Sequence, residues 1–210
     1  MSSEADGQLA ARDRGGARTR AQILDVAWKL MTEHGVGVPM RDVADRVGIS
    51  RQALYLHYPS RADLLTAMTR QHDVQSGIAQ RFIAAAAAPS AVEALEAVIR
   101  TWFDYVPDIL PVARALQAAA ATDPAAAEAW WDRMTAATRP IRRVVERLHA
   151  EGVLDPSWET EAAVQFLWSL THVRAWDDLV VHYGWSPEAF VERQTEAAKR
   201  ILLTASYRTA

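Results

Sequence analysis

Apolar residues recur along the chain at spacings of three and four, which is the period of an amphipathic α-helix. In the N-terminal third, this pattern predicts a first helix over about 17–35, a second over about 39–46, and a third beginning after Ser50. Ser50 is placed to cap the third helix, and Gly48 is placed to end the second in a left-handed conformation. Residues 1–16 are small, polar and glycine-containing, and we expect a disordered arm there.

Longer helical patterns follow from about residue 61 onward. They predict helices over about 61–87, 90–105, 108–121, 124–150, 157–183 and 186–205. No segment alternates polar and apolar residues with period two, so no sheet is expected. The predicted fold class is all-α, with an N-terminal three-helix unit over 17–65 that continues without a flexible linker into a larger helical bundle over 66–210.

Composition excludes several classes of protein. The 210-residue chain is 50% hydrophobic and 23% charged, which is typical of a globular protein. It contains no cysteine, so disulfides, thiolate metal ligands and cysteine nucleophiles are all excluded. No apolar run approaches the roughly 18 residues of a membrane span, and the N-terminus lacks the apolar centre of a secretory signal. We therefore expect a cytoplasmic protein without a membrane partner.

The net charge of −3 is unevenly distributed. Residues 1–70 hold ten Lys and Arg against eight Asp and Glu, whereas residues 71–210 hold thirteen against eighteen. The small positive excess in the N-terminal third is a weak indication of a polyanionic partner.

Two short helices joined by a tight glycine-containing turn are the layout of a helix-turn-helix. The second helix of such a motif enters the major groove of DNA with its N-terminal residues toward the base edges. Arg51, Gln52 and Ala53 hold these positions, and they can contact guanine, adenine and a thymine methyl group respectively. Tyr55 and His57 are placed where their polar groups could reach phosphates. The same pattern also suits a solvated surface helix of an ordinary bundle, so spacing alone leaves both interpretations open.

Residues 18–65 resemble the DNA-binding domain of the tetracycline-repressor (TetR) family of bacterial transcription regulators. The matching positions are Arg20, Ile23, Ala27, Gly35, Val43, Ala44, Gly48, Ser50, Leu54, Tyr55, His57 and Leu64. The resemblance places the helix-turn-helix at about 39–58 and implies a double-stranded DNA operator as the partner. The residues expected to contact this DNA are Arg41, Ser50, Arg51, Gln52, Ala53, Tyr55, His57 and Arg61.

Four positions depart from the family pattern. Pro39 stands where members often carry Thr or Ser, so a hydroxyl contact to phosphate is missing there. Gln52 replaces a commonly small residue and favours a base contact. Tyr58 and Arg61 replace Phe and Lys, and both keep the chemistry, because an aromatic ring still packs and a cation still meets phosphate.

Beyond about residue 70, the resemblance implies an architecture rather than individual residues. It implies an all-helical domain that binds a small-molecule effector and forms a homodimer, mainly through the last two long helices. Apolar residues on the predicted helix 157–183 form two rows, which indicates contacts on two sides. A partner subunit would cover the second side, but a helix at the centre of a monomer would show the same rows.

Eight tryptophans are many for a chain of this length. Large aromatics at helical spacing are most often core or interface residues, although a ligand pocket between helices is lined by the same residue types. Our candidates for ligand contact are Trp102, Phe103, Trp131, Trp168, His172 and Trp176.

No pattern indicates catalysis, a metal or a cofactor. The sequence has no Gly-rich phosphate loop, H-E-x-x-H or G-x-S-x-G. Arg174, Asp178 and His182 share one helix face, but two potential ligands beside a cation fit an ion-pair row better than a metal site. The sequence favours a non-enzymatic, dimeric, ligand-responsive transcription regulator, most often a repressor in this family. The alternative is a helical small-molecule-binding or interaction protein that does not bind DNA.

Overall fold

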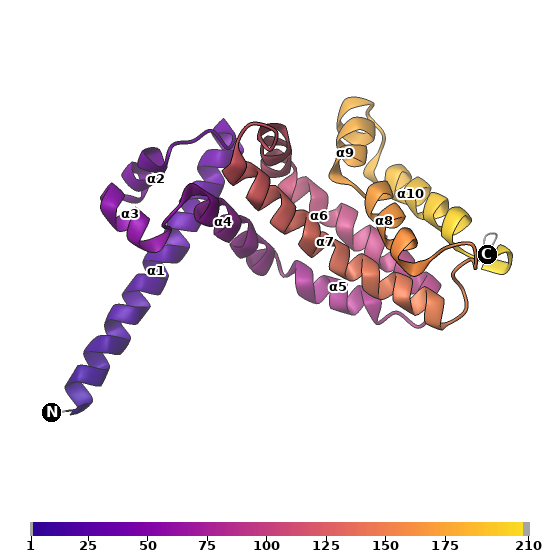
Figure 1. Cartoon of the computed structure of the whole chain (residues 1–210), viewed down its shortest axis with the longest axis horizontal. Coiled ribbons are helices and arrows are strands. Elements are labelled where there is room, and N and C mark those ends of the chain that lie inside the picture. The colour runs from indigo at the N-terminus through magenta and orange to yellow at the C-terminus, as the bar shows by residue number, and fades with distance from the viewer. Residues whose placement is uncertain (1, 208–210) are drawn as a thin grey trace. The chain divides into compact units, whose positions relative to one another are not determined.

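The computed structural model describes residues 2–207, with side chains from residue 15 onward (Figure 1). Its elements are α1 (Ser2–His34), α2 (Met40–Val47), α3 (Arg51–His57), α4 (Arg61–Ser76), α5 (Ile78–Ala86), α6 (Ala91–Ala119), α7 (Pro124–Ala150), α8 (Thr160–Leu170), α9 (Val173–Trp176), the π-helix η1 (Asp177–His182), α10 (Pro187–Leu202) and the 3₁₀ helix η2 (Ala205–Tyr207). Within residues 2–207, β pairing is limited to an isolated bridge between Leu154 and Leu203. The prediction of an all-α fold is confirmed.

The chain divides into two compact units, and each unit combines two separate stretches of sequence. The first unit comprises the residues up to Gln75 together with Pro111–Arg133. The second comprises Ser76–Leu110 and the residues from Met134 onward. The first unit therefore holds α1 to α4 and the parts of α6 and α7 that adjoin their connecting turn. The functional boundary expected near residue 65 stays a prediction.

The three N-terminal helices share a small core within the first unit. In this core, α2 packs against both α1 and α3. The fully buried side chains, each 0% exposed, are those of Ile23, Ala27, Val43, Ala44 and Leu54. These positions follow the three-and-four spacing of the sequence, so the predicted amphipathic pattern is confirmed here.

The helix break predicted around Pro107 is wrong, because α6 is continuous through Pro107 and Pro111. A proline removes one helical hydrogen bond and usually ends or kinks a helix. Both prolines are exposed, so water can hydrate the backbone groups on that side of α6. Their neighbours Val106 and Leu110 are buried, and this burial favours continuation of the helix.

The helix predicted over 157–183 is wrong as one continuous element, because the structure divides it into α8, α9 and η1. α8 ends where the hydroxyl of Thr171 donates to the Leu167 carbonyl at 2.8 Å. His172 is then extended, and its Nδ1 accepts the backbone N–H of Arg174 at 3.1 Å, which caps α9. Side chains that bond nearby backbone compete with helix continuation, and a hydrophobic pattern does not reveal this competition.

Two further elements differ from the expected boundaries. The helix expected over 61–87 is interrupted between α4 and α5 at Gly77, which is left-handed with φ 65°. α1 begins at Ser2, whereas the sequence predicts a disordered arm over 1–16, of which residue 1 lies outside the described residues. The segment 8–12, Gln-Leu-Ala-Ala-Arg, is rich in helix formers. Such residues offset the cost of roughly 1 kcal/mol for each glycine inside a helix.

Candidate nucleic-acid interface and apolar cavity

The turn between α2 and α3 is fixed by two local signals. Gly48 has φ 81° and ψ 32°, and its N–H donates to the Ala44 carbonyl at 2.9 Å. The N–H of Ile49 donates to the same carbonyl at 3.1 Å, which completes the C-terminal cap of α2. The hydroxyl of Ser50 then accepts the N–H of Ala53 at 3.1 Å and caps α3. Both cap predictions are confirmed.

α3 has one buried face and one exposed face. Leu54 is 0% exposed and Tyr58, which follows the last residue of the helix, is 8% exposed, so these two side chains anchor α3. Arg51 and Gln52 are exposed, and Tyr55 is 40% exposed. The outer face therefore presents a guanidinium, an amide and a phenol within five residues.

The other predicted contact residues of the helix-turn-helix differ in exposure. The Arg41 side chain is 68% exposed, and its Nε lies 3.0 Å from the carboxylate of Asp42. Ser50 is exposed, while Ala53 and His57 are half-buried. Arg41 and Ser50 are therefore open to solvent, and a partner could reach them without a change in the fold.

Arg61 is placed differently from the other predicted contacts. Its side chain is 24% exposed, and it donates to the Asp123 carboxylate at 2.5 Å and to the Val36 carbonyl. Burial alone would raise the pKa of Asp123, but hydrogen bonds from Arg61 and from two N–H groups at the start of α7 hold that pKa below its usual value. Arg61 thus anchors the start of α4 within the first unit through bonds to other parts of the chain.

A second group of charges, the α4–α7 ion-pair cluster, lies farther along α4 in the first unit. Arg70 pairs with Asp132, and Arg133 pairs with both Asp73 and Asp132. The Asp132 side chain is 20% exposed. The pKa of the Asp132 carboxyl is lowered mainly by the hydrogen bond from Arg70, and burial opposes this shift. The cluster ties α4 to the N-terminal half of α7.

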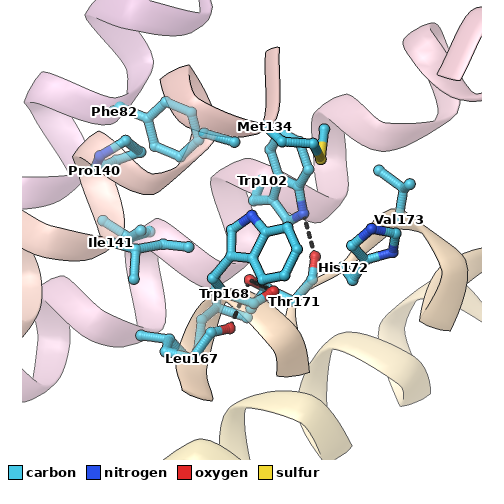
Figure 2. A pocket seen from close by; sticks show the side chains of 13 residues that line it. Phe82, Trp102, Met134, Pro140, Ile141, Leu167, Trp168, Thr171, His172 and Val173 are labelled. Atoms are coloured by element: carbon cyan, nitrogen blue, oxygen red, sulfur yellow. Dashed lines mark hydrogen bonds between the residues drawn. The ribbon is translucent and has the colours of Figure 1, made fainter. Parts of the chain in front are cut away.

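The second unit encloses a small apolar cavity among residues of α5, α6, α7, α8 and α9 (Figure 2). Its volume is about 20 Å³, and its lining includes Phe82, Trp102, Met134 and Trp168. The indole N–H of Trp102 donates to the Thr171 carbonyl at 2.6 Å (Figure 2). This space holds about one water molecule, whereas ligand pockets usually measure roughly 300–1,000 Å³.

The structure brings three of the six candidate ligand residues together. Trp102, Trp168 and His172 line the cavity. Phe103 and Trp176 lie instead in a buried aromatic cluster, where both rings contact Phe190 with centroid distances of 4.7 and 5.3 Å. The sixth candidate, Trp131, belongs to the first unit and is 58% exposed.

Comparison with known proteins agrees with the geometry of the helix-turn-helix. Residues 23–68 match the family model of bacterial regulatory proteins of the tetR family. This part of the chain is an N-terminal domain of the TetR type.

Known proteins resemble this chain over different lengths. The HTH-type transcriptional repressor LfrR of Mycolicibacterium smegmatis is 35% identical over 65 residues, which are 30% of this chain and 34% of LfrR. The match therefore spans about a third of that relative's length. The solved structure of NalD, the secondary repressor of the MexAB-OprM multidrug efflux pump in Pseudomonas aeruginosa, is 20% identical with a TM-score of 0.64. That comparison covers 91% of this chain and 98% of NalD.

A solved regulatory protein of the TetR family from Rhodococcus RHA1 is 22% identical to this chain with a TM-score of 0.64. The comparison covers 89% of this chain and 98% of the Rhodococcus protein. At these sequence identities, the two structural likenesses show that the fold is shared across both units of the chain.

Leu56 is a surface residue of the TetR-type helix-turn-helix that sequence reasoning missed. It is 78% exposed on α3 and lies four residues after Gln52, so both share one helix face. An exposed apolar side chain at this place can contact a thymine methyl group. The signal was present in the sequence, because the inward positions Leu54 and Tyr58 leave the intervening position 56 on the outside.

The cavity residues that sequence reasoning missed come mainly from α5 and α7. Phe82, Met134, Pro140 and Ile141 lie far from the tryptophan-rich segments in sequence, and no periodicity connects them. Among the described residues, no group of three or more His, Asp or Glu side chains is arranged to hold a metal ion. No described helix is both long enough and apolar enough to cross a membrane.

Proposed function

We propose that the protein is a dimeric, ligand-responsive transcriptional regulator that binds a palindromic DNA operator. The observation that carries this proposal is the division of α3 into two faces. Leu54 holds the helix in the core, while Arg51, Gln52 and Tyr55 are directed to solvent. A short helix anchored on one side and polar on the other is what insertion into a major groove requires.

The exposed residues of α3 differ in the part of DNA that they suit. Arg51 and Gln52 carry groups that bond guanine and adenine edges, and Leu56 adds an apolar surface for thymine. Tyr55 on α3 and Arg41 on α2 are both exposed and suit phosphate oxygens, which position a protein without reading sequence. Arg61 is assigned a structural role, because its guanidinium bonds Asp123 and Val36.

The second unit is the proposed effector-binding domain. Its cavity has an aromatic lining that includes Trp102 and Trp168, which suits a small molecule, but the cavity is nearly closed. A ligand that binds an open form more tightly than this closed form shifts the population toward the open form. Release of DNA by such a shift is the expected response of a repressor, and LfrR and NalD are both named as repressors.

Exposed apolar residues of the second unit support a homodimer. Val181, Tyr183 and Trp185 are 53%, 70% and 41% exposed and follow one another closely after α9. A cluster of large apolar side chains on a surface commonly marks a contact with another protein. In a dimer, two copies of α3 would read half-sites about one helical turn of DNA apart.

A double variant of α3 tests DNA binding. Gln52→Ala/Tyr55→Ala removes one base-reading and one phosphate-reading group, both from exposed positions, so the fold is expected to remain stable. We expect affinity for DNA from the protein's own upstream region to fall roughly 10- to 100-fold in a fluorescence anisotropy titration.

The matched control is Gln80→Ala/Tyr207→Ala, which makes the same substitutions at exposed positions of the second unit. This control should bind DNA like the wild type. Equal binding by both double variants would contradict the proposal and favour a helical small-molecule-binding or interaction protein.

A further inference from the structure

Trp168 occupies the middle of the apolar cavity (Figure 2). Its ring packs edge-on against His172, with ring centroids 5.3 Å apart and an interplanar angle of 81°. The indole N–H of Trp102 is fixed by its bond to the Thr171 carbonyl, but no such bond within the described part of the chain fixes the indole N–H of Trp168. The Trp168 ring is therefore held by ring contacts, which another aromatic ring could replace.

The backbone beside Trp168 is a joint between two helices. α8 ends two residues after it, and His172 is extended, with φ −61° and ψ 140°, before α9 begins. Trp168 is half-buried, so its ring has a route to solvent. By contrast, Phe103 and Trp176 are 0% and 5% exposed and both pack on Phe190. Trp168 can leave its place without breaking a hydrogen bond of its ring or unwinding a long helix.

The lining of the cavity carries no formal charge near neutral pH. Its polar side chains are the two indoles, the Thr171 hydroxyl and the His172 imidazole. Burial lowers the pKa of His172, and the charge of Arg174 lowers it further, so this imidazole is neutral. Burying an ionised ligand without a counter-charge is strongly unfavourable. The lining therefore selects uncharged molecules.

The remaining volume of about 20 Å³ means that any ligand larger than water must displace a side chain. We infer that the cavity binds an uncharged, fused-ring aromatic compound of about the size of indole, which takes the place of the Trp168 ring. This inference rests on the proposed function, whose effector it assigns to a chemical class.

Removal of the Trp168 ring tests the inference directly. Trp168→Ala leaves a space shaped like indole, and apolar cavities of on the order of 150 Å³ bind small aromatic molecules. The probe is indole, added to the whole chain without DNA. At an indole concentration about ten times Kd, the Tm of the variant should rise by about 3–6 °C. Calorimetric titration should give a Kd for the variant at least about tenfold below that of the wild type, in which the Trp168 ring competes for the site.

The controls separate the cavity from general effects of indole. Trp131→Ala removes the same ring from a position that is 58% exposed, so indole should not raise the Tm of this variant above the change seen for the wild type. Tryptamine and indole-3-acetate carry the same ring system with a positive and a negative charge. Both should bind Trp168→Ala at least about tenfold more weakly than indole, because the lining offers no counter-charge.

Three outcomes would overturn the inference. Equal affinity of indole for the wild type and Trp168→Ala would mean that the Trp168 ring is not displaced. Tighter binding of tryptamine would favour a cation held against the aromatic faces. If Trp168→Ala does not fold, Trp168→Leu is titrated in its place, and absence of indole binding to that folded variant overturns the inference as well. Since no readout uses DNA, a failed titration leaves the proposed DNA-binding function standing, and a failed DNA test leaves the titration interpretable.

Discussion

At the scale of single residues, the helix-turn-helix depends on positions that each have a distinct structural role. Gly48 supplies a left-handed backbone with φ 81°, and Ser50 supplies the hydroxyl that caps α3. Leu54 is the buried residue that holds α3 in the core, so the exposed side chain of Gln52 can contact a partner. Gly48 and Leu54, which shape the motif, are thus separate from Arg51 and Gln52, whose exposed side chains would read DNA.

The backbone role of Gly48 can be isolated from packing. A Cβ added at Gly48 or at Gly37 would meet nothing within 4 Å, but only Gly48 of the two has a positive φ. Gly48→Ala should therefore lower the free energy of unfolding by about 1–2 kcal/mol. Gly37→Ala should leave it unchanged or raise it by about 0.4–1 kcal/mol, because alanine restricts the unfolded chain. Urea denaturation at a fixed protein concentration measures both, and equal effects would contradict the backbone argument.

At the scale of elements, the features predicted correctly from the sequence are those that depend on residues close together in the chain. The caps at Gly48 and Ser50 depend on residues within four positions, and both were predicted. The continuity of α6 through Pro107 depends on burial of neighbouring side chains by other helices, which a single-sequence pattern does not contain. The break of the predicted helix 157–183 depends on how Thr171 bonds the backbone.

The same distinction applies to the candidate sites. The outward residues of α3 were predictable, because one helix face decides which side chains meet solvent. The cavity was not, since Trp102 lines it while its chain neighbour Phe103 faces an aromatic cluster. Both residues are large aromatics of α6, and only the packing of distant elements such as α5 and α7 distinguishes them.

The α4–α7 ion-pair cluster carries a prediction at the element scale. Asp132→Asn removes the charge shared by Arg70 and Arg133 and should lower the free energy of unfolding by about 1 kcal/mol at pH 7. We expect a value at the low end for charge-assisted bonds, because the Arg70 side chain is 60% exposed and solvent screens the pair.

The pKa of Asp132 is lower in the folded than in the unfolded chain, which fixes the sign of the pH dependence. The contribution of the charged Asp132 carboxylate to the free energy of unfolding is fully present above the unfolded pKa of about 3.9. It is lost as the pH falls through the lower pKa of the folded chain. The stability difference between wild type and Asp132→Asn should therefore shrink below about pH 4. The control is Asp108→Asn at an exposed position, and its free energy of unfolding should equal that of the wild type at pH 7. A stability difference between wild type and Asp132→Asn that does not change with pH would contradict its electrostatic origin.

At the scale of the whole molecule, the proposed homodimer sets the geometry of the operator. Two α3 helices related by two-fold symmetry would require half-sites with one fixed spacing along the DNA. The apolar residues Val181, Tyr183 and Trp185 are the exposed groups of the second unit that a second copy would cover. A dimer should therefore require a fixed spacing of the two half-sites, whereas independent chains should not.

Insertion of base pairs between the half-sites tests this linkage. An insertion of roughly 5 bp, half a helical turn, turns one half-site to the opposite side of the duplex. Affinity measured by gel shift should then fall to that of a single half-site. A substitution of the same number of central base pairs keeps the spacing and should retain most of the affinity. Equal binding to the original and lengthened sites would indicate that each chain binds DNA independently.

The π-helix η1 gives the chain a place where its length can change. A π-helix closes hydrogen bonds between residues five apart rather than four, so Asp177–His182 stores one residue more than an α-helical turn needs. Loss of one residue there could be absorbed by a return to α-helical bonding. Loss of one residue inside α6 would rotate every later side chain of that helix by about 100°. Deletions of a single residue, natural or engineered, should therefore be tolerated better in η1 than in α6, because η1 can return to α-helical bonding between α9 and α10.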